Sequence, residues 1–253
     1  MSDSRLLSAL SLPPASRLDK RVAKKLLLEH CQPTASDRRL VQDGLEELLW
    51  VASLKPGNAL LEAVADDALP YGEIAVLHAG LRPMAHVLRM SELIHRGIPY
   101  PVVLVVVVGE TEALSLATKR PAQDGKRSVV LERTYLSEPI AVGKPTPAQR
   151  AFVDSLALAG LGVRTLREAY ASWIHRMTAL EASDVSGGFR PPDSPEAAVV
   201  LRETVDRYQS LGRELEALRA QANRERQLAR RVELNVEIRR LEALREEALR
   251  RKG

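Results

Sequence analysis

The sequence lacks the features of a secreted or membrane-spanning protein. It has one cysteine, Cys31, among 253 residues, so no disulfide can form within the chain, which fits a reducing compartment. The seven apolar residues at 102–108 are too few for a transmembrane helix, which needs about 20. The first residues, Met-Ser-Asp-Ser-Arg, do not form the apolar stretch of a secretory signal. We therefore expect a cytoplasmic protein.

Aromatic side chains and charge of one sign are also scarce. Aromatic residues make up 4% of the sequence, so the core must be aliphatic. The formal net charge of +4 allows a nucleic-acid partner without requiring one. The length is sufficient for one well-packed core and an appendage.

The most strongly patterned stretch is Val102–Val108, in which six of seven residues are valine. Pro101 and Gly109 bound it. A short β-branched run with such boundaries is typical of a buried central strand. Helices must then cover both faces of that strand, which predicts an α/β domain.

The segments before this strand predict its neighbours. We expect a strand over residues 73–81 and a helix over 84–95 that stops before Gly97. Strand, helix and strand in this compact order favour parallel pairing of 73–81 with 101–108.

The other expected elements complete a mixed sheet of four or five strands with flanking helices. Two shorter strands, at 113–118 and 128–135, would be joined by a hairpin connection at 119–127. Asp19 can begin a helix that runs to about His30. The remaining elements are a helix with the apolar stripe Leu40, Val41, Leu45, Leu48, Leu49 and Ala52, and an edge strand at 59–65.

Signals for the start of helices are clear in the C-terminal third of the sequence. Thr146 and Thr165 each open a capping box, with Gln or Glu three residues later. Ser194 followed by Pro195 begins another helix. The three expected regions are a core domain at 1–183, a Gly- and Pro-rich linker at 184–195, and a long helix or coiled coil at 196–253.

The C-terminal region is predicted to be one long helix. Gly212 is the only Gly or Pro from Leu201 to Arg251, and about 55 helical residues would make a rod of roughly 80 Å. Apolar residues keep a 3–4 spacing in two runs that fall out of phase between Asn223 and Arg231. Such a seam needs another surface: the core domain, a second copy or another protein. The expected partner-binding residues are Leu211, Leu215, Leu218, Leu234, Ile238 and Leu241.

Motifs for metal or nucleophilic chemistry are missing. None of the five histidines forms an i, i+4 pair, and Glu92 with His95 supplies half of a metal site. There is no phosphate-binding loop and no nucleophile elbow, and Cys31 is best interpreted as a bystander thiol. We therefore expect no cofactor, no metal and no catalytic residue.

A metal-dependent nuclease would place an acid on one strand and an acid-x-Lys sequence on the next. Asp66-Asp67 and Glu73 supply acids, but the residue two positions after Glu73 is Ala75. Glu110 and Glu132 lack the lysine as well. A degenerate or divergent nuclease therefore stays an alternative.

Two basic clusters could contact DNA phosphates. The first is Lys20, Arg21, Lys24 and Lys25, and the second is Arg224, Arg226, Arg230 and Arg231. Charged flanks are also common on coiled coils, and no aromatic residues lie among these arginines to stack on single-stranded bases. A DNA-binding module is a second alternative.

Several stretches together resemble one bacterial family, domain of unknown function 4391. The more specific are Ile98-Pro-Tyr-Pro before the aliphatic strand and Val232-Glu-Leu-Asn235 in the basic coil. The others are Leu12-Pro13, Leu18-Asp-Lys-Arg-Val22, Leu45-Glu-Glu-Leu-Leu-Trp50, Leu54-Lys-Pro56, Glu73-Ile-Ala-Val76, Leu116-Ala-Thr-Lys119, and Gln227 with Arg231.

This resemblance implies a component of anti-phage or restriction-like loci, encoded beside a helicase and a site-specific DNA methyltransferase. It supplies no catalytic residues. We therefore expect a non-catalytic subunit or adaptor of a DNA-processing defence complex. Its partner would be the helicase, the methyltransferase or a second copy, with DNA also possible.

Overall fold

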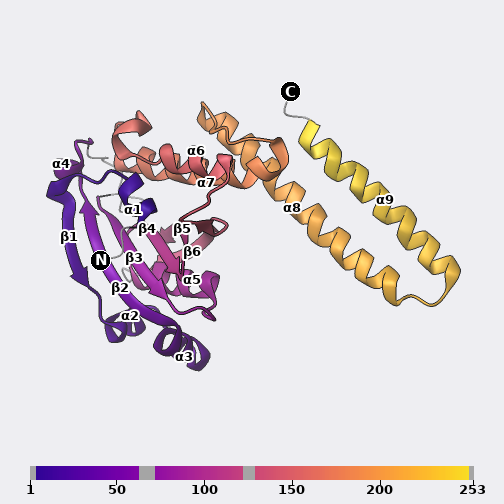
Figure 1. Ribbon diagram of the computed structural model, residues 1–253, viewed down its shortest axis with the longest axis horizontal. Coiled ribbons are helices and arrows are strands. Elements are labelled where there is room, and N and C mark those ends of the chain that lie inside the picture. The colour runs from indigo at the N-terminus through magenta and orange to yellow at the C-terminus, as the bar shows by residue number, and fades with distance from the viewer. Residues whose placement is uncertain (1–3, 63–71, 122–128, 251–253) are drawn as a thin grey trace. The chain divides into compact units, whose positions relative to one another are not determined.

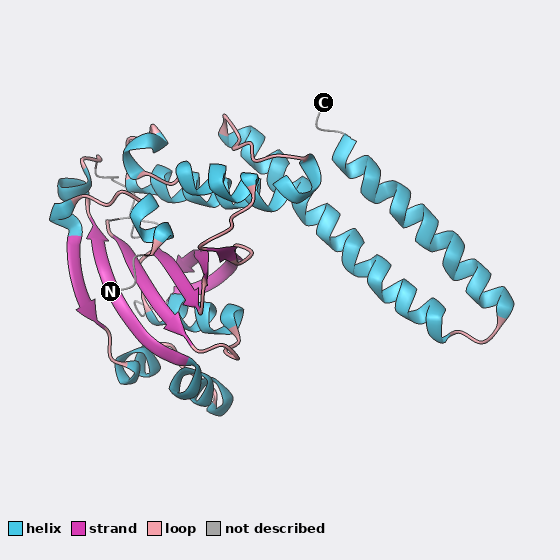
Figure 2. Cartoon of the chain, viewed as in Figure 1, coloured by secondary structure: helices cyan, strands magenta, loops and turns pink. Residues whose placement is uncertain are grey.

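The computed structural model describes residues 4–62, 72–121 and 129–250 (Figure 1). Contacts group the chain into two compact units, Met1–Met177 and Thr178–Gly253. The first is built on one β-sheet and the second is helical (Figure 2). Within the described ranges, no helix combines the length and the apolar character needed to cross a membrane.

Among its described residues, the first unit contains seven strands in one sheet, so the expected four or five were too few. The path runs β1-β2-β3-β4-β5-β6, and β7 pairs with β5. The strands are β1 Arg17–Arg21, β2 Leu45–Leu54, β3 Ile74–Leu81, β4 Val102–Val108, β5 Thr111–Pro121, β6 Val129–Leu136 and β7 Ile140–Ala141.

The helices of the chain precede, connect and follow these strands. They are α1 Arg5–Ala9, η1 Pro14–Ser16, α2 Lys24–His30, α3 Ala35–Gly44, α4 Pro56–Ala59, α5 Val87–Gly97, α6 Pro147–Asp154, η2 Leu158–Leu161, α7 Leu166–Ser186, α8 Pro195–Arg224 and α9 Leu228–Arg250. α7 crosses the boundary between the two units, and the first three residues of the predicted linker belong to it. The predicted domain limit at 183 stays a prediction.

The central strand and its parallel neighbour are confirmed. β3 and β4 pair in parallel, with Leu77 opposite Leu104, and α5 is the crossover between them. Residues 102–106 are buried. The antiparallel pairing of β5 with β6 is also confirmed, although residues 122–128 of the expected hairpin connection lie outside the described residues.

Two predicted helices contain strands instead. Residues 45–54 form β2, and the last four residues of this strand are all buried, so its second half is covered on both faces. Pairing with β1 on one side and β3 on the other outweighs the helical periodicity. The predicted helix from Asp19 is β1 followed by α2. β1 shows no alternation to predict it, since all five of its residues are exposed.

The expected edge strand at 59–65 is not formed in its described part. Ala59 ends α4, and Leu60 adopts a left-handed conformation with φ of 57°. Glu62 makes an isolated bridge with Thr165. Residues 63–65 lie outside the described residues.

Helices cover both faces of the sheet, as predicted (Figure 1). α2, α3 and α5 enclose an aliphatic core in which Leu27, Val41 and Leu93 meet Leu77 and Leu104 of the sheet. α1, α6 and the first part of α7 lie against the other face.

Two aromatic side chains of α7 anchor this second layer. The Trp173 indole nitrogen donates to the carbonyl oxygen of Leu156, at 2.9 Å. The Tyr170 hydroxyl accepts the Ala117 N–H at 2.9 Å and lies 3.0 Å from the carbonyl oxygen of Val102. The pairing of β4 with β5 ends at Leu104 and Ser115. The Tyr170 hydroxyl therefore provides a hydrogen-bond partner for backbone groups of the two strands beyond that pair.

The predicted single rod is a helical hairpin. α8 and α9 have 30 and 23 residues, and a three-residue connection at 225–227 reverses the chain direction (Figure 1). Ser194 caps α8 through the N–H of Ala197, as predicted. The predicted capping box at Thr146 is present as well.

Candidate functional site

The six predicted partner-binding residues line the inside of the hairpin. Leu215 of α8 and Leu234, Ile238 and Leu241 of α9 are all less than a tenth exposed. Leu211 and Leu218 pack against them, together with Ala222. Each apolar run is therefore the mate of the other, and the seam closes within the chain instead of on the core domain, a second copy or another protein.

Polar contacts fix the register of the two helices. The Arg219 guanidinium lies 2.6 Å from a carboxylate oxygen of Glu242. The Arg245 guanidinium lies 4.1 Å from the centre of the Tyr208 ring, within the range of a cation–π interaction. Gly212 lies beneath the same guanidinium, which would be 3.5 Å from a Cβ at that position.

The turn explains the phase slip between the two apolar runs. Glu225 has extended backbone angles, and its N–H donates to the carbonyl oxygen of Gln221 at 3.1 Å, closing α8. Gln227 donates its N–H to the Glu225 carboxylate at 2.9 Å. Its carbonyl oxygen accepts the Arg231 N–H in the first turn of α9. The second apolar run is out of phase with the first because the chain reverses direction between α8 and α9.

The predicted DNA-binding arginines lie at this hairpin tip. Arg224, Arg226, Arg230 and Arg231 are all exposed. Arg230 contacts the Glu233 carboxylate at 2.6 Å. The other three make no ion pair within the part of the chain that the structure describes.

The outward face of α9 carries an apolar row that sequence reasoning missed. Leu228, Val232 and Val236 are 67%, 54% and 63% exposed. We call these three residues the outer stripe. They recur every four residues on the side of α9 opposite the buried residues of the seam. The spacing is visible in the sequence, but the longer leucine runs dominate the pattern.

An acid and a lysine meet at one edge of the α/β unit. The Lys55 ammonium, just after β2, lies 3.6 Å from a carboxylate oxygen of Glu73, just before β3. The Ser53 hydroxyl donates to the same carboxylate. The nuclease pattern requires a lysine two residues after the acid, whereas here the antiparallel pairing of β2 with β3 brings Lys55, which follows β2, to Glu73. Asp66-Asp67 lie outside the described residues.

A family model for a domain of unknown function (DUF4391) matches residues 10–244. The chain belongs to this family. No curated protein and no solved structure matches it.

Two of the stretches that resemble DUF4391 meet in the core. The Lys119 ammonium donates to the carbonyl oxygens of Ile98 and Tyr100, at 2.7 and 2.6 Å, in the segment that joins α5 to β4. Pro99 and Pro101 have no N–H to donate there. Burial lowers the pKa of Lys119 to about 7. Lys119 therefore holds in place the segment that leads into the central strand, β4.

The imidazole of His95 lies in the same interior. It is fully buried on α5, and its Nε2 is 2.9 Å from the Ser115 hydroxyl. Burial, with the Lys119 charge as a smaller cause, holds the pKa of His95 well below its usual value, so the ring is neutral. Glu92 binds Arg89 instead of sharing a site with His95. Across the described ranges, no three His, Cys, Asp or Glu side chains are grouped to hold a metal ion.

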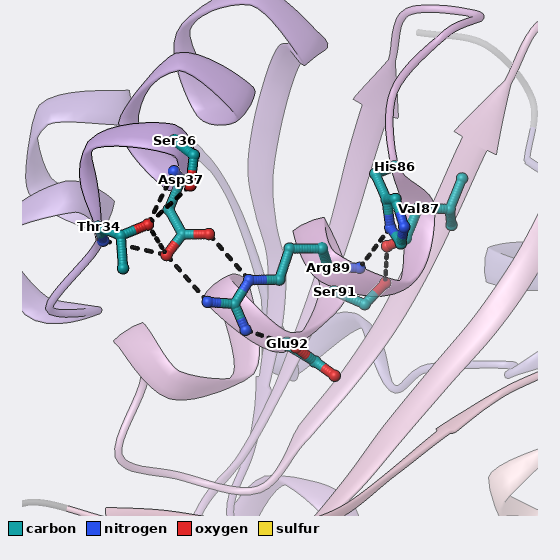
Figure 3. Close-up of polar contacts among 8 residues, drawn as sticks. All are labelled: Thr34, Ser36, Asp37, His86, Val87, Arg89, Ser91 and Glu92. Carbon is teal, nitrogen blue, oxygen red and sulfur yellow. Dashed lines mark hydrogen bonds and ion pairs between the residues drawn. The ribbon is translucent and has the colours of Figure 1, made fainter.

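A partly buried ion pair joins α3 to α5 in this DUF4391 chain (Figure 3). The Arg89 guanidinium donates to both carboxylate oxygens of Asp37, at 2.8 and 2.9 Å. The same carboxylate accepts the Thr34 N–H and hydroxyl at the start of α3. Hydrogen bonds from Arg89 hold the pKa of Asp37 well below its usual range. Asp37 and Arg89 therefore each have partners within the fold, and the pair serves to join α3 to α5.

The remaining sequence candidates in the α/β unit occupy two environments. Cys31 is buried in the aliphatic core, and burial raises the pKa of its thiol. Of the first basic cluster, Lys20 and Arg21 lie on the exposed edge strand β1, and Lys24 and Lys25 lie on α2. Lysine and arginine on an edge strand also discourage pairing with another sheet.

Proposed function

We propose that this DUF4391 protein is a non-catalytic subunit or adaptor of a bacterial anti-phage or restriction-like DNA-processing complex. It assembles through its C-terminal hairpin. The protein partner is a helicase or a DNA methyltransferase, as the family resemblance implies, or a second copy of the chain.

The observation that supports this proposal is the self-contained hairpin. Leu215, Leu234, Ile238 and Leu241 close the seam within the chain, so α8 and α9 hold together without a partner. At 1.5 Å per residue, the 30 residues of α8 extend for about 45 Å. Two helices can bury only one stripe each against the other, which leaves their outer faces for assembly.

The test opens the hairpin and measures assembly. Leu215→Glu with Ile238→Glu places two carboxylates in the apolar seam, where their desolvation is unfavourable. We expect this variant to lose its partner during affinity purification from the native host, as measured by light scattering and mass spectrometry. The control is Ala217→Glu with Ala243→Glu, at two exposed positions of the same helices. If the seam variant keeps its partner, or if the wild-type chain elutes alone as a monomer, the proposal is wrong.

A DNA-binding role is the second candidate, because three tip arginines lack an acidic partner among the described residues. Removing one arginine that binds a phosphate should reduce the slope of log affinity against log salt by roughly 0.9 on duplex DNA. We therefore expect Arg224→Ala and Arg226→Ala to lower that slope together by about 2 if the tip binds DNA. Arg230→Ala, which removes an arginine already paired with Glu233, is the matched comparison. A slope unchanged by all three would exclude this candidate.

A divergent nuclease is favoured by one observation, the contact between Lys55 and Glu73. An acidic side chain can bind a divalent cation while a nearby lysine stabilises charge on the transferring phosphate. Cleavage of DNA that requires Mg²⁺ and is abolished in both Glu73→Gln and Lys55→Met would support this candidate. Arg82→Met, at an exposed ion pair with Glu46, is the control. Cleavage that survives in Glu73→Gln would assign the activity to other residues or to a contaminant.

A further inference from the structure

We propose that the outer stripe of α9 docks an acidic amphipathic helix of the assembly partner. This inference rests on the proposed adaptor function and names the surface and the chemistry of its partner. It moves the interface from the leucine seam, which is buried within the hairpin, to the opposite side of α9.

The apolar part of the surface is the outer stripe itself. Leu228, Val232 and Val236 are each more than half exposed, while Leu234 and Ile238 on the same helix are less than a tenth exposed. Four residues rise about 6 Å along a helix, so the three side chains form a row about 12 Å long. A row of this kind fits the i, i+4 side chains of another helix.

The charges around the outer stripe indicate the sign of the partner. Residues 224–240 contain six arginines and three glutamates, a net charge of +3. All three glutamates are engaged within the hairpin. Glu233 binds Arg230, Glu237 binds Arg240, and Glu225 accepts the Gln227 N–H.

The positive charges of four arginines in this segment therefore remain available to a partner. They are Arg224, Arg226, Arg231 and Arg239, none of which forms an ion pair with another described residue. Carboxylates that flank an apolar row on a partner helix would complement them.

The same features disfavour two other occupants. A second copy would bring two surfaces of net charge +3 together without acids to compensate them. Nucleic acid would satisfy the arginines, but duplex DNA has no helical row of apolar groups to cover Val232 and Val236. An acidic amphipathic helix is the one class of occupant that fits both the charge and the apolar row.

Site-specific photo-cross-linking of the full chain in its native host tests this assignment. A benzophenone amino acid is placed at Val232, and the cross-linked segment is identified by mass spectrometry. We expect it to be a segment of a different protein with apolar residues at i and i+3 or i+4, flanked by Asp or Glu. Val200, on α8, is the matched control, because it is a valine that is 57% exposed. It should give at least tenfold fewer cross-links to that segment.

Charge reversal supplies an independent measurement. Arg231→Glu with Arg239→Glu should lower the Val232 cross-link yield at least about tenfold. Arg213→Glu, an exposed arginine on α8, should leave it within about twofold. Circular dichroism of the purified variants checks that the hairpin remains helical, as expected for substitutions at exposed positions.

The possible failures separate this inference from the proposed function. If a partner protein purifies with the full chain but Val232 cross-links to nucleic acid, to a second copy or to a segment without acids, the outer-stripe assignment is wrong and the adaptor role stands. The same holds if Val232 and Val200 cross-link equally. If no partner and no second copy purifies with the full chain, both proposals are wrong.

Discussion

The ion pair between Asp37 and Arg89 allows a quantitative test of how α3 is held against α5. Asp37→Asn keeps the size of the side chain and an oxygen for the Thr34 cap, but it removes the charge that accepts two hydrogen bonds from Arg89. Hydrogen bonds to charged groups contribute about 1.5–3 kcal/mol each. Arg89 is 33% exposed and keeps its bond to Glu92, so water offsets part of that loss. We expect the free energy of unfolding to fall by about 2 kcal/mol.

Urea unfolding at neutral pH measures this difference, and Glu46→Gln is the matched control. Glu46 lies 3.9 Å from Arg82, and both side chains are more than half exposed. Breaking that pair should therefore change stability by less than about 1 kcal/mol. If Asp37→Asn lowers the free energy of unfolding no more than Glu46→Gln does, burial does not strengthen the Asp37–Arg89 contact and our reasoning is refuted.

The same pair predicts a pH dependence of defined sign. Arg89 lowers the pKa of Asp37 in the folded state below its usual 3.8. Its stabilisation is therefore present above about pH 4 and is lost as the pH falls below that value. The stability difference between wild type and Asp37→Asn should narrow between about pH 4 and pH 2.5. A difference that stays constant over that range would contradict this assignment.

Further variants test the core contacts and the hairpin. Tyr170→Phe should lower the free energy of unfolding by about 1–3 kcal/mol, measured by urea, because it leaves buried backbone groups of Ala117 and Val102 without a partner. Gly212→Ala should raise the melting temperature of the hairpin, since helical alanine is favoured by up to about 1 kcal/mol and the new Cβ would meet Arg245 at an ordinary contact distance of 3.5 Å. Because burial lowers the pKa of Lys119 from 10.5 to about 7, the unfolded state binds more protons between these values, so wild type should gain stability relative to Lys119→Met as the pH rises from about 7 to 10. A flat difference over that range would show that Lys119 titrates normally.

The parts of the fold that the sequence predicted are those in which burial and local signals agree. Val102–Val108 is β-branched in six of its seven residues, its first five residues are buried, and Pro101 and Gly109 mark its ends, so its place beside β3 was predictable. The helix start at Thr146 was predictable for a similar reason, because side-chain caps are local interactions. β2 was not, since the apolar residues of 45–54 fit a helix as well as a doubly buried strand, and only pairing with β1 and β3 decides between them.

The same limit applies to the candidate site. The sequence showed that Leu215 and Ile238 belong to apolar seams, but a seam has the same pattern whether its mate is another chain or the next helix. The contact between Lys55 and Glu73 was missed because a motif search counts positions along one strand, whereas the antiparallel pairing of β2 and β3 brings together residues 18 positions apart. The membership of the seam was therefore predictable, and the identity of its mate was not.

The hairpin also has a consequence for the order of folding. Its contacts join residues that are near in sequence, such as Arg219 and Glu242, which are 23 positions apart. The sheet unit depends on closures such as Leu6 with Glu112, which are 106 positions apart. Because the entropy lost in closing a loop grows with its length, local contacts form faster than distant ones. When the chain refolds, we expect α8 and α9 to pair, starting at their turn, before the sheet is complete, although both helices follow the sheet in the sequence.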